Sequence, residues 1–317
     1  MSIWFLPGQS DRVSLEIWLL NLSDILKYRA LGFFLAFIAL VTLILTTSAH
    51  AAPYSSAQLQ SLHHPVPGGV AVIEITGIPK GKHPAPSARY LNKPVLVTPT
   101  DAGQWVAIVG IPLSVPLAPQ SLEITLGEKK TTQIFAIRDK KYREQRIKLK
   151  TNKHVDLSPQ DLARFEREKK LQDDAYQQFS AQLPSNLLLD RPVKGPLSSP
   201  FGLKRFFNDQ PRAPHSGLDF AVPTGTPVQA PAAGRVILVG DYFFNGKTVF
   251  VDHGQGMISM FCHLSVIDVK PGQSIARGQV LGQVGATGRV TGAHLHWNVS
   301  LNDARVDPAI FIGMFTP

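Results

Sequence analysis

Hydrophobic and polar positions divide the chain into stretches with different periodicities. A single long apolar run, Ala30 to Leu45, lies near the amino end. Two later regions, 65–150 and 191–317, consist of short β-branched or alternating runs between turn residues, which is typical of strands. Between them, residues 158–182 carry apolar side chains at helical spacing. The pattern predicts a mainly β protein with one connecting helix.

The first β region, 65–150, is predicted to form a small β-sandwich that carries no chemical motif. Its expected strands are Val70–Ile75, Pro94–Thr98, Gln104–Ile111, Leu122–Leu126, Gln133–Ile137 and Arg146–Leu149. Residues 52–64 are expected to be a linker ahead of it. The adjacent pair His63 and His64 would point to opposite sides of an extended chain, so we expect two solvated side chains rather than a metal site.

The helical stretch lies within a connecting segment, residues 151–190. Ser158 is a suitable N-cap, and Pro159 fits the first helical position. The apolar stripe of this helix is broken and consists of Leu162, Phe165, Leu171, Ala175 and Phe179. Because charged residues cover the other positions, we expect a solvated linker helix. A coiled-coil arm is the alternative, and the stripe is short for one.

The carboxy-terminal region, 191–317, is predicted to form an antiparallel sheet or barrel. Turn pairs such as Asn245-Gly246 and Pro271-Gly272 separate its strands. The expected strands are Thr226–Ala230, Arg235–Gly240, Thr248–His253, Met257–His263, Val280–Gly285 and His296–Leu301.

The amino-terminal segment, residues 1–51, has the form of an export signal. Lys27 and Arg29 precede the apolar run, and Ala49-His50-Ala51 ends it in the small-residue pattern of a cleavage site. We therefore expect an exported protein of the periplasm or cell envelope. The alternative is a membrane anchor formed by residues 30–49, for which the apolar run is near the minimum length. Residues 1–26 fit either a long region ahead of the signal or an incorrectly assigned start.

Composition and charge narrow the range of partners. The 317 residues have a formal net charge of +9 at pH 7, and 17% of them are charged. The mean hydropathy of +0.02 and the single apolar run exclude a disordered chain and a multi-span membrane protein. One cysteine, Cys262, excludes an internal disulfide and a Cys-rich zinc site. A basic exported chain is expected to work near anionic polymers, and without a dense Lys/Arg patch we expect no nucleic-acid partner.

Chemistry-bearing residues form one suggestive pattern in the carboxy-terminal region. It comprises four of the ten histidines and one carboxylate, namely His215, Asp219, His263, His294 and His296. Either short motif alone, H-x-H or H-x-x-x-D, is expected by chance roughly 0.3 to 0.5 times in such a chain. Only the combination of these residues within one compact β region therefore indicates a site.

The spacing of these residues suits a metal ion. On a strand, His294 and His296 lie on one face about 7 Å apart, so that one can bind a metal while the other faces the same site. A bend through Ser-Gly-Leu can bring His215 and Asp219 onto one ion. Two imidazoles and one carboxylate leave a fourth tetrahedral position open, as in a hydrolytic zinc site. His263, at the end of another strand, can supply a further base or donor.

These stretches resemble a known family. Residues from about 198 to 311 are similar to the lysostaphin-type zinc metallopeptidase domain of bacterial cell-wall endopeptidases. The matching stretches are Ser199-Pro-Phe-Gly202, His215-Ser-Gly-Leu-Asp219, Pro223-Thr-Gly225-Thr-Pro227-Val, Ala232-Ala-Gly234-Arg-Val236, His263-Leu264, Pro271-Gly272 to Gly278, Val284-Gly285 to Thr287-Gly288 and His294-Leu-His296. The 65–150 region resembles the β-sandwich that precedes this domain in some members.

The resemblance implies a role for each residue of the pattern. It makes His215, Asp219 and His296 the ligands of one Zn²⁺ ion, and it makes His263 and His294 the catalytic histidines. In this family the substrate is the peptide part of peptidoglycan. The implied function is a zinc-dependent endopeptidase that hydrolyses peptidoglycan cross-links.

Two neighbours of the strand histidine need separate comment. Phe261 stands where the family often has Tyr, which removes a hydroxyl but none of the five site groups. Cys262 is expected on the face of its strand opposite His263, and we therefore assign it to the core.

Two alternatives to the enzyme are open. A catalytically silent relative would bind peptidoglycan or activate an amidase, but such proteins lose ligands and this chain keeps all five groups. A carrier domain is suggested by residues 269–281, which resemble the turn-rich half of biotinyl and lipoyl domains. Such a domain needs a lysine at an exposed hairpin tip, and Lys247 lacks that setting.

The segment Arg205–Ala213 immediately precedes the first expected ligand. We expect an ordinary strand connection there. The alternatives are a latent state in which Asn208 occupies the open zinc position, and masking of the groove by the sandwich and the linker helix.

Overall fold

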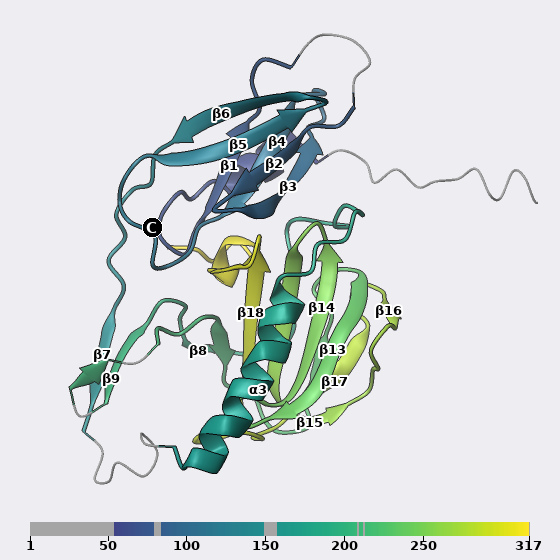
Figure 1. Ribbon diagram of the computed structural model, residues 1–317. Coiled ribbons are helices and arrows are strands. Elements are labelled where there is room, and N and C mark those ends of the chain that lie inside the picture. The colour runs from purple at the N-terminus through teal and green to yellow at the C-terminus, as the bar shows by residue number, and fades with distance from the viewer. Residues whose placement is uncertain (1–53, 79–83, 149–156, 208, 212, 317) are drawn as a thin grey trace, which may run out of the picture. The chain divides into compact units, whose positions relative to one another are not determined.

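The computed structural model describes residues 54–78, 84–148, 157–207, 209–211 and 213–316 (Figure 1). The expected export signal, 1–51, lies outside these residues. Within the described part of the chain, no helix is both long and apolar enough to cross a bilayer. Strands far outnumber helices, and the predicted mainly β fold class is confirmed.

The first β region forms one antiparallel sheet of six strands. These are β1 (Val70–Glu74), β2 (Ser87–Tyr90), β3 (Lys93–Pro99), β4 (Trp105–Gly110), β5 (Gln120–Leu126) and β6 (Lys129–Phe135), in the order β1-β4-β3-β2-β5-β6. The start of β3 pairs with β2, whereas its later residues pair with β4. The sheet therefore folds over at β3 and encloses a core of its own. Five expected strands have counterparts here, and β2 was not predicted.

Strand β4 is buried on both faces. Ala107 and Val109 belong to the core inside the six-stranded sheet. Val106 and Ile108, which alternate with them, belong to a second core that also contains residues of the carboxy-terminal region. This explains why β4 is a continuous apolar run instead of an alternating one. The two β regions are joined by packed hydrophobic side chains.

The segment before β1 is packed against the sheet. It contains α2 (Ser56–Ser61), and the side chain of Leu59 in this helix is buried. His63 Nδ1 lies 3.1 Å from both the N and the O atom of Val72, and His64 pairs with Val70. Both histidines are half-buried. The expectation that they are solvated is wrong, because β1 offers backbone partners to them.

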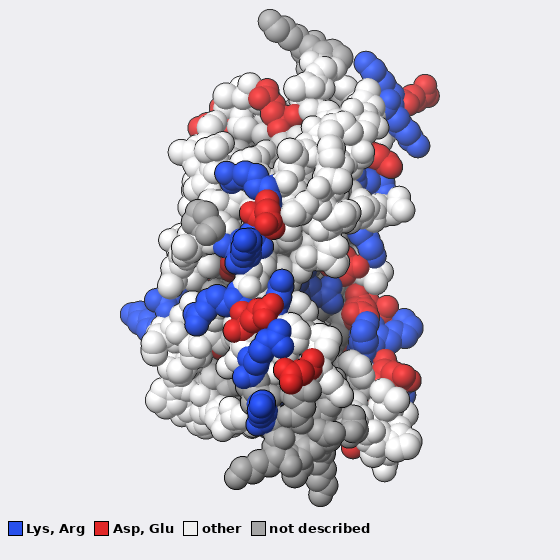
Figure 2. All heavy atoms as spheres, turned by 90° about the vertical axis from the view of Figure 1, so that its left-hand side faces the viewer, with Lys and Arg blue, Asp and Glu red and all other residues white. Residues whose placement is uncertain are grey.

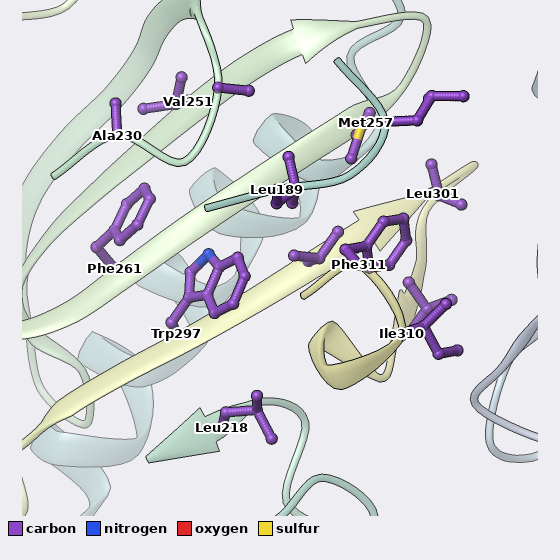
Figure 3. Close-up of a cluster of buried hydrophobic side chains, with 14 of the residues drawn as sticks. Leu189, Leu218, Ala230, Val251, Met257, Phe261, Trp297, Leu301, Ile310 and Phe311 are labelled. Atoms are coloured by element: carbon purple, nitrogen blue, oxygen red, sulfur yellow. The ribbon is translucent and has the colours of Figure 1, made fainter. Parts of the chain in front are cut away.

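The carboxy-terminal region forms a ten-stranded antiparallel sheet. Its strands are β8 (Leu197–Ser199), β11 (Leu218–Phe220), β12 (Pro227–Gln229), β13 (Gly234–Tyr242), β14 (Gly246–Gly254), β15 (Met257–Ile267), β16 (Ser274–Ile275), β17 (Val280–Val284), β18 (Leu295–Leu301) and β19 (Ala304–Val306), followed by the 3-10 turn η1 (Pro308–Ile310). Its central path runs β13-β14-β15-β18-β11-β8. One face of these central strands packs on the large core drawn in Figure 3.

One expected strand of the sandwich belongs elsewhere. β7 (Glu144–Ile147), which covers part of the predicted run Arg146–Leu149, pairs in parallel with β9 (Lys204–Phe207). β9 in turn pairs with β10 (Gln210–Pro211) just before His215. The backbone of β7 thus finds its hydrogen-bond partners beside the carboxy-terminal sheet.

Helix α3 (Pro159–Tyr176) begins as the sequence predicts. Ser158 is the N-cap, and its side chain accepts a hydrogen bond from the Asp161 N–H. The expected apolar stripe is only partly buried: Leu162 and Leu171 are 44% and 52% exposed, whereas Ala175 is buried.

The helix buries Ala175 of the stripe together with Tyr176, which was not expected. Ala175 and Tyr176 lie in a cluster with Phe250, Met260 and Cys262 of the carboxy-terminal sheet. The Tyr176 hydroxyl donates to Asn298 Oδ1 at 2.8 Å. The linker helix is therefore present as predicted and is mostly exposed, but its carboxy-terminal end packs on the sheet that α3 crosses in Figure 1.

Charges of both signs are mixed on the surface. On the face drawn in Figure 2, Lys and Arg side chains alternate with Asp and Glu side chains of the described residues. On α3, Lys169 pairs with Asp173 and Lys170 pairs with Asp174, so opposite charges also lie side by side along this helix. The net charge is therefore distributed on this face and does not form one continuous field.

Asn302 connects the two β regions through a pair of hydrogen bonds. Its Oδ1 accepts from the Gly110 N–H at 2.6 Å, and its Nδ2 donates to the Gly110 carbonyl at 3.0 Å. Position 110 has no room for a side chain, because a Cβ would meet Leu301 Cβ at 2.7 Å. Asn302 itself has a φ of 42°, which Asn tolerates better than most residues.

We predict that Asn302→Gly destabilises the protein by about 2 to 3 kcal/mol, because two buried backbone groups lose their partners. Glycine suits a positive φ, so the loss isolates the hydrogen bonds from backbone strain. Urea unfolding measures the effect. Ile134→Thr, at a side chain that is 63% exposed, is the control and should change little. Equal stability of Asn302→Gly and wild type would contradict the prediction.

Candidate functional site

Strand β18 has a buried face and a polar face. Leu295, Trp297 and Val299 point into the large core, as Figure 3 shows for Trp297. His296 lies on the opposite face, and His294 precedes the strand by one residue. This alternation follows from the period of two along a strand. The burial of the apolar set thereby fixes the face on which the histidines lie.

Strand pairing brings a carboxylate beside His296. In the antiparallel pair of β11 and β18, Asp219 stands opposite His296 and Leu218 stands opposite Trp297. Directly opposite residues project to the same side of a sheet. Asp219 therefore shares the polar face with His296, and Leu218 shares the core with Trp297. His215, four residues before Asp219, lies where the chain enters β11.

Three donor atoms converge at this point. His215 Nε2 lies 3.0 Å from Asp219 Oδ1 and 3.0 Å from His296 Nδ1, and the last two atoms are 2.8 Å apart. The edges of a tetrahedral zinc site with ligands at 2.0–2.2 Å are about 3.3 Å. The three donor atoms match that geometry if each moves away from the centre of the triangle by a few tenths of an ångström. Among the described residues it is the group that can hold a metal ion.

Hydrogen bonding determines which nitrogen of His215 faces the triangle. Its Nδ1–H donates to the Pro200 carbonyl at 2.8 Å, which leaves a lone pair on Nε2. Asp219 Oδ1 is also an acceptor. Acceptor atoms at this spacing repel each other unless a proton or a metal ion lies between them. The donor set of two imidazoles and one carboxylate fits Zn²⁺.

Burial and mutual contact shift the pKa values of Asp219 and His296. Burial alone would raise the pKa of Asp219, but its contacts with His215 and His296 hold the pKa well below its usual range. Burial lowers the pKa of His296, against the hydrogen bond to Asp219. An ionised carboxylate and neutral imidazoles are the forms that bind a metal.

His263 reaches the same face through an unusual backbone conformation. Cys262 stands opposite His296 in the register of β15 and β18, so it occupies the polar face of the sheet. Strict alternation would then place His263 in the core beside Phe261. Instead His263 has a φ of 62° and lies at a register shift, and its ring centre is 4.7 Å from that of His294.

The interpretation of Cys262 is therefore right in its result but wrong in its reason. The thiol is fully buried, in the cluster covered by α3, and burial raises its pKa. Cys262 shares a face with the candidate metal site because it stands opposite His296, and the positive φ at His263 brings that imidazole to the same face, which breaks the alternation on which the interpretation rested.

Backbone carbonyls orient His263 and His294. His263 Nδ1–H donates to the Thr287 carbonyl at 3.0 Å, and His294 Nδ1–H donates to the Gly292 carbonyl at 3.0 Å. Each Nε2 thus remains available for proton transfer. His294 Nε2 lies 3.9 Å from Asp219 Oδ1. Burial, together with His296 and His294, lowers the pKa of His263 to about 3.

Sequence reasoning missed several supporting groups. Arg205 Nη2 lies 3.8 Å from Asp219 Oδ2 and 3.2 Å from Ser199 Oγ. The carbonyls of Pro200 and Thr287 orient two of the histidines. Ser199, Pro200 and Thr287 all lie in stretches that carried the family resemblance, which was the available signal. Arg205 has no such signal, because its place depends on the pairing of β9.

Two earlier expectations concern lysine and asparagine. Lys247 Nζ donates to the Ser265 carbonyl at 2.9 Å, so its amine is engaged along strand β14. This does not suit a carrier lysine.

The segment before His215 forms the paired strands β9 and β10, an ordinary connection. Asn208 lies outside the described residues.

Two family models match the chain. Residues 213–308 match the model of peptidase family M23, and residues 63–140 match that of the peptidase family M23 N-terminal domain. The crystal structure of a protein from Pseudomonas aeruginosa assigned to peptidase M23 is 56% identical. That likeness covers 82% of this chain and all of the other chain, with a TM-score of 0.70.

Named relatives match part of the chain. Peptidoglycan DD-endopeptidase ShyA of Vibrio cholerae is 46% identical over 87 residues, which is 27% of this chain. DD-carboxypeptidase/endopeptidase Mpg of Neisseria meningitidis is 36% identical over 121 residues, or 38% of this chain. The chain covers only 20% of the length of ShyA and 28% of that of Mpg.

A buried carboxylate lies behind the site. Asp307 caps η1, where its Oδ1 accepts from the Ala309 N–H at 3.0 Å. Burial raises the pKa of Asp307 to about 6, although this hydrogen bond and the charges of Lys140 and His215 lower it. Because the folded pKa exceeds the ordinary value of 3.8, its contribution to stability is complete at low pH and is lost as the pH rises through 6.

We predict that Asp307→Asn, which keeps the capping oxygen, unfolds like wild type below about pH 4 and is more stable at pH 7. A shift from 3.8 to about 6 corresponds to at most about 3 kcal/mol. Urea titrations of both proteins at several pH values measure the difference. A stability difference that does not change with pH would refute the assignment.

Proposed function

The chain belongs to peptidase family M23, and we propose that it is a zinc-dependent endopeptidase that hydrolyses peptide cross-links of peptidoglycan in the bacterial cell envelope. The observation that carries this proposal is the convergence of three metal-binding atoms, from His215, Asp219 and His296, on one face of the sheet. The names of the relatives ShyA and Mpg support the substrate class.

In this proposal His215, Asp219 and His296 hold one Zn²⁺ ion. When bound, zinc supplies a Lewis acid that activates water and polarises the scissile carbonyl. The hydrogen bond from His215 to Pro200 fixes one ligand, and such outer contacts raise metal affinity. Arg205 lies near the second oxygen of Asp219, where its positive charge favours the ionised carboxylate.

We assign His263 and His294 to proton transfer and to stabilisation of the tetrahedral oxyanion. Their Nδ1 atoms donate to backbone carbonyls, which leaves a lone pair on each Nε2. His294 Nε2 lies 3.9 Å from Asp219 Oδ1, and the ring centre of His263 lies 6.1 Å from that of His296. A neutral imidazole can accept a proton from the attacking water and return it to the leaving amine. Once protonated, it can donate to the developing negative oxygen.

We further propose that residues 1–51 export the protein, since peptidoglycan lies outside the cytoplasm, and that a retained anchor at residues 30–49 is the alternative. The silent relative is less favoured, because the complete triangle and both flanking histidines are present in one place. Zinc content and hydrolysis together distinguish a silent protein from an enzyme.

We predict that the purified protein binds one zinc per chain and converts cross-linked muropeptide dimers into monomers. Asp219→Asn should lose at least about tenfold in zinc affinity and all measurable hydrolysis, since one anionic ligand is removed. Metal analysis and mass spectrometry of the products report the two effects. Asp209→Asn, at an exposed carboxylate, is the matched control. Hydrolysis that persists after chelation of the protein would refute the zinc mechanism.

His294→Ala should separate catalysis from metal binding. We expect unchanged zinc content and a fall in kcat of about 10²- to 10⁴-fold, the range for loss of an acid–base group. Steady-state hydrolysis of the same dimers provides kcat. Loss of zinc in this variant would instead place His294 among the ligands.

A further inference from the structure

We infer that helix α3 positions a catalytic histidine: Gln172 and Glu168 hold the turn Tyr242–Gly246, and this turn holds His263. The inference rests on the proposed function, in which His263 handles a proton. It concerns residues outside both matched family regions, because α3 lies between 140 and 213.

The backbone of His263 is strained. A residue other than Gly with a φ of 62° is held in a conformation that costs about 1 to 2 kcal/mol. Such strain persists only where surrounding contacts over-determine it. Without the positive φ, strand alternation would turn the imidazole into the core beside Phe261. Contacts that maintain this φ therefore maintain the imidazole in the site.

Two backbone carbonyls hold His263 in this conformation. Its backbone N–H donates to the Asn245 carbonyl at 2.9 Å, and its ring donates to the Thr287 carbonyl. Thr287 is itself tied to the turn, because the Lys247 N–H donates to Thr287 Oγ1 at 2.9 Å. At Gly246 a Cβ would meet the Thr287 carbonyl carbon at 2.3 Å. The turn and the Thr287 segment thus move together.

Side chains of α3 hold the turn Tyr242–Gly246. Glu168 Oε2 accepts from the Phe243 N–H at 2.7 Å, and Gln172 Oε1 accepts from Asn245 Nδ2 at 2.6 Å. Phe165 packs edge-on against Phe244 with ring centres 5.0 Å apart. Positions 165, 168 and 172 are spaced by three and four residues, so they share one face of the helix.

These contacts form a continuous path from Gln172 through Asn245 to the His263 backbone. The side chain of Asn245 bonds to the helix while its carbonyl bonds to His263. Removal of the Gln172 amide leaves the Asn245 side chain with only a long contact of 3.9 Å to Met260 Sδ, and this allows His263 to relax toward ordinary strand geometry. Because misplacement of a reacting group by about 1 Å can cost about a hundredfold in rate, the effect should appear in kcat.

The test compares three variants of the full-length protein. Gln172→Ala removes the acceptor, Gln172→Glu keeps one, and Lys170→Ala is the control, since Lys170 points to solvent on the same helix and pairs with Asp174. We expect Gln172→Ala to lose about ten- to a hundredfold in kcat, with KM, zinc content and melting temperature near wild type. Gln172→Glu should recover kcat to within about threefold, and Lys170→Ala should match wild type.

Unchanged kcat in Gln172→Ala would overturn the inference, and so would a loss shared equally by Lys170→Ala or by Gln172→Glu. If wild type hydrolyses no muropeptide, the proposed function fails, and amide hydrogen exchange then decides the inference. The His263 amide should exchange about tenfold faster in Gln172→Ala than in wild type, because its acceptor Asn245 is released. An unchanged exchange rate would overturn it.

Discussion

The site depends on the two-faced burial of β18. Leu295, Trp297 and Val299 can be buried only if His296 points to the opposite face. The register of the neighbouring strand then decides that Asp219 stands beside this histidine. A slip of one residue would exchange the two faces and place imidazole and carboxylate groups in the core. Hydrophobic packing thus sets the geometry of the polar groups, and the metal-binding atoms converge because the core leaves them no other side.

His263 does not follow the alternation of its strand, and its position on the polar face therefore needs contacts from outside the strand. Regular alternation cannot bring it to the polar face, so its backbone leaves the strand conformation and takes a positive φ. The carbonyl of Asn245 then accepts from the His263 backbone N–H, and the carbonyl of Thr287 accepts from its ring. These two hydrogen bonds replace the regular strand pairing at this residue. The polar face of the sheet continues under α3, where Cys262 and Tyr176 are packed. The candidate site and the helix therefore occupy neighbouring parts of one surface.

Local determinants can be recognised in the sequence: Ser158 caps its helix because capping needs only a few adjacent residues. The set His215, Asp219 and His296 is indicated by the family resemblance of short motifs, although it is the pairing of distant strands that brings these residues together. Determinants that depend on distant partners could not be predicted. The pairing of β7 with β9 and the burial of Tyr176 are settled by tertiary contacts, and a single positive φ reversed the face expected for Cys262 relative to His263.

The double burial of β4 has an evolutionary consequence. Val106 and Ile108 fit against side chains that belong to the other half of the molecule, while Asn302 from that half bonds to Gly110. If recombination replaced one β region by that of a distant homologue, the side chains at the contact between the two regions would no longer be complementary. The two halves are therefore expected to diverge in concert, as a single inherited unit, although each is matched by its own family model.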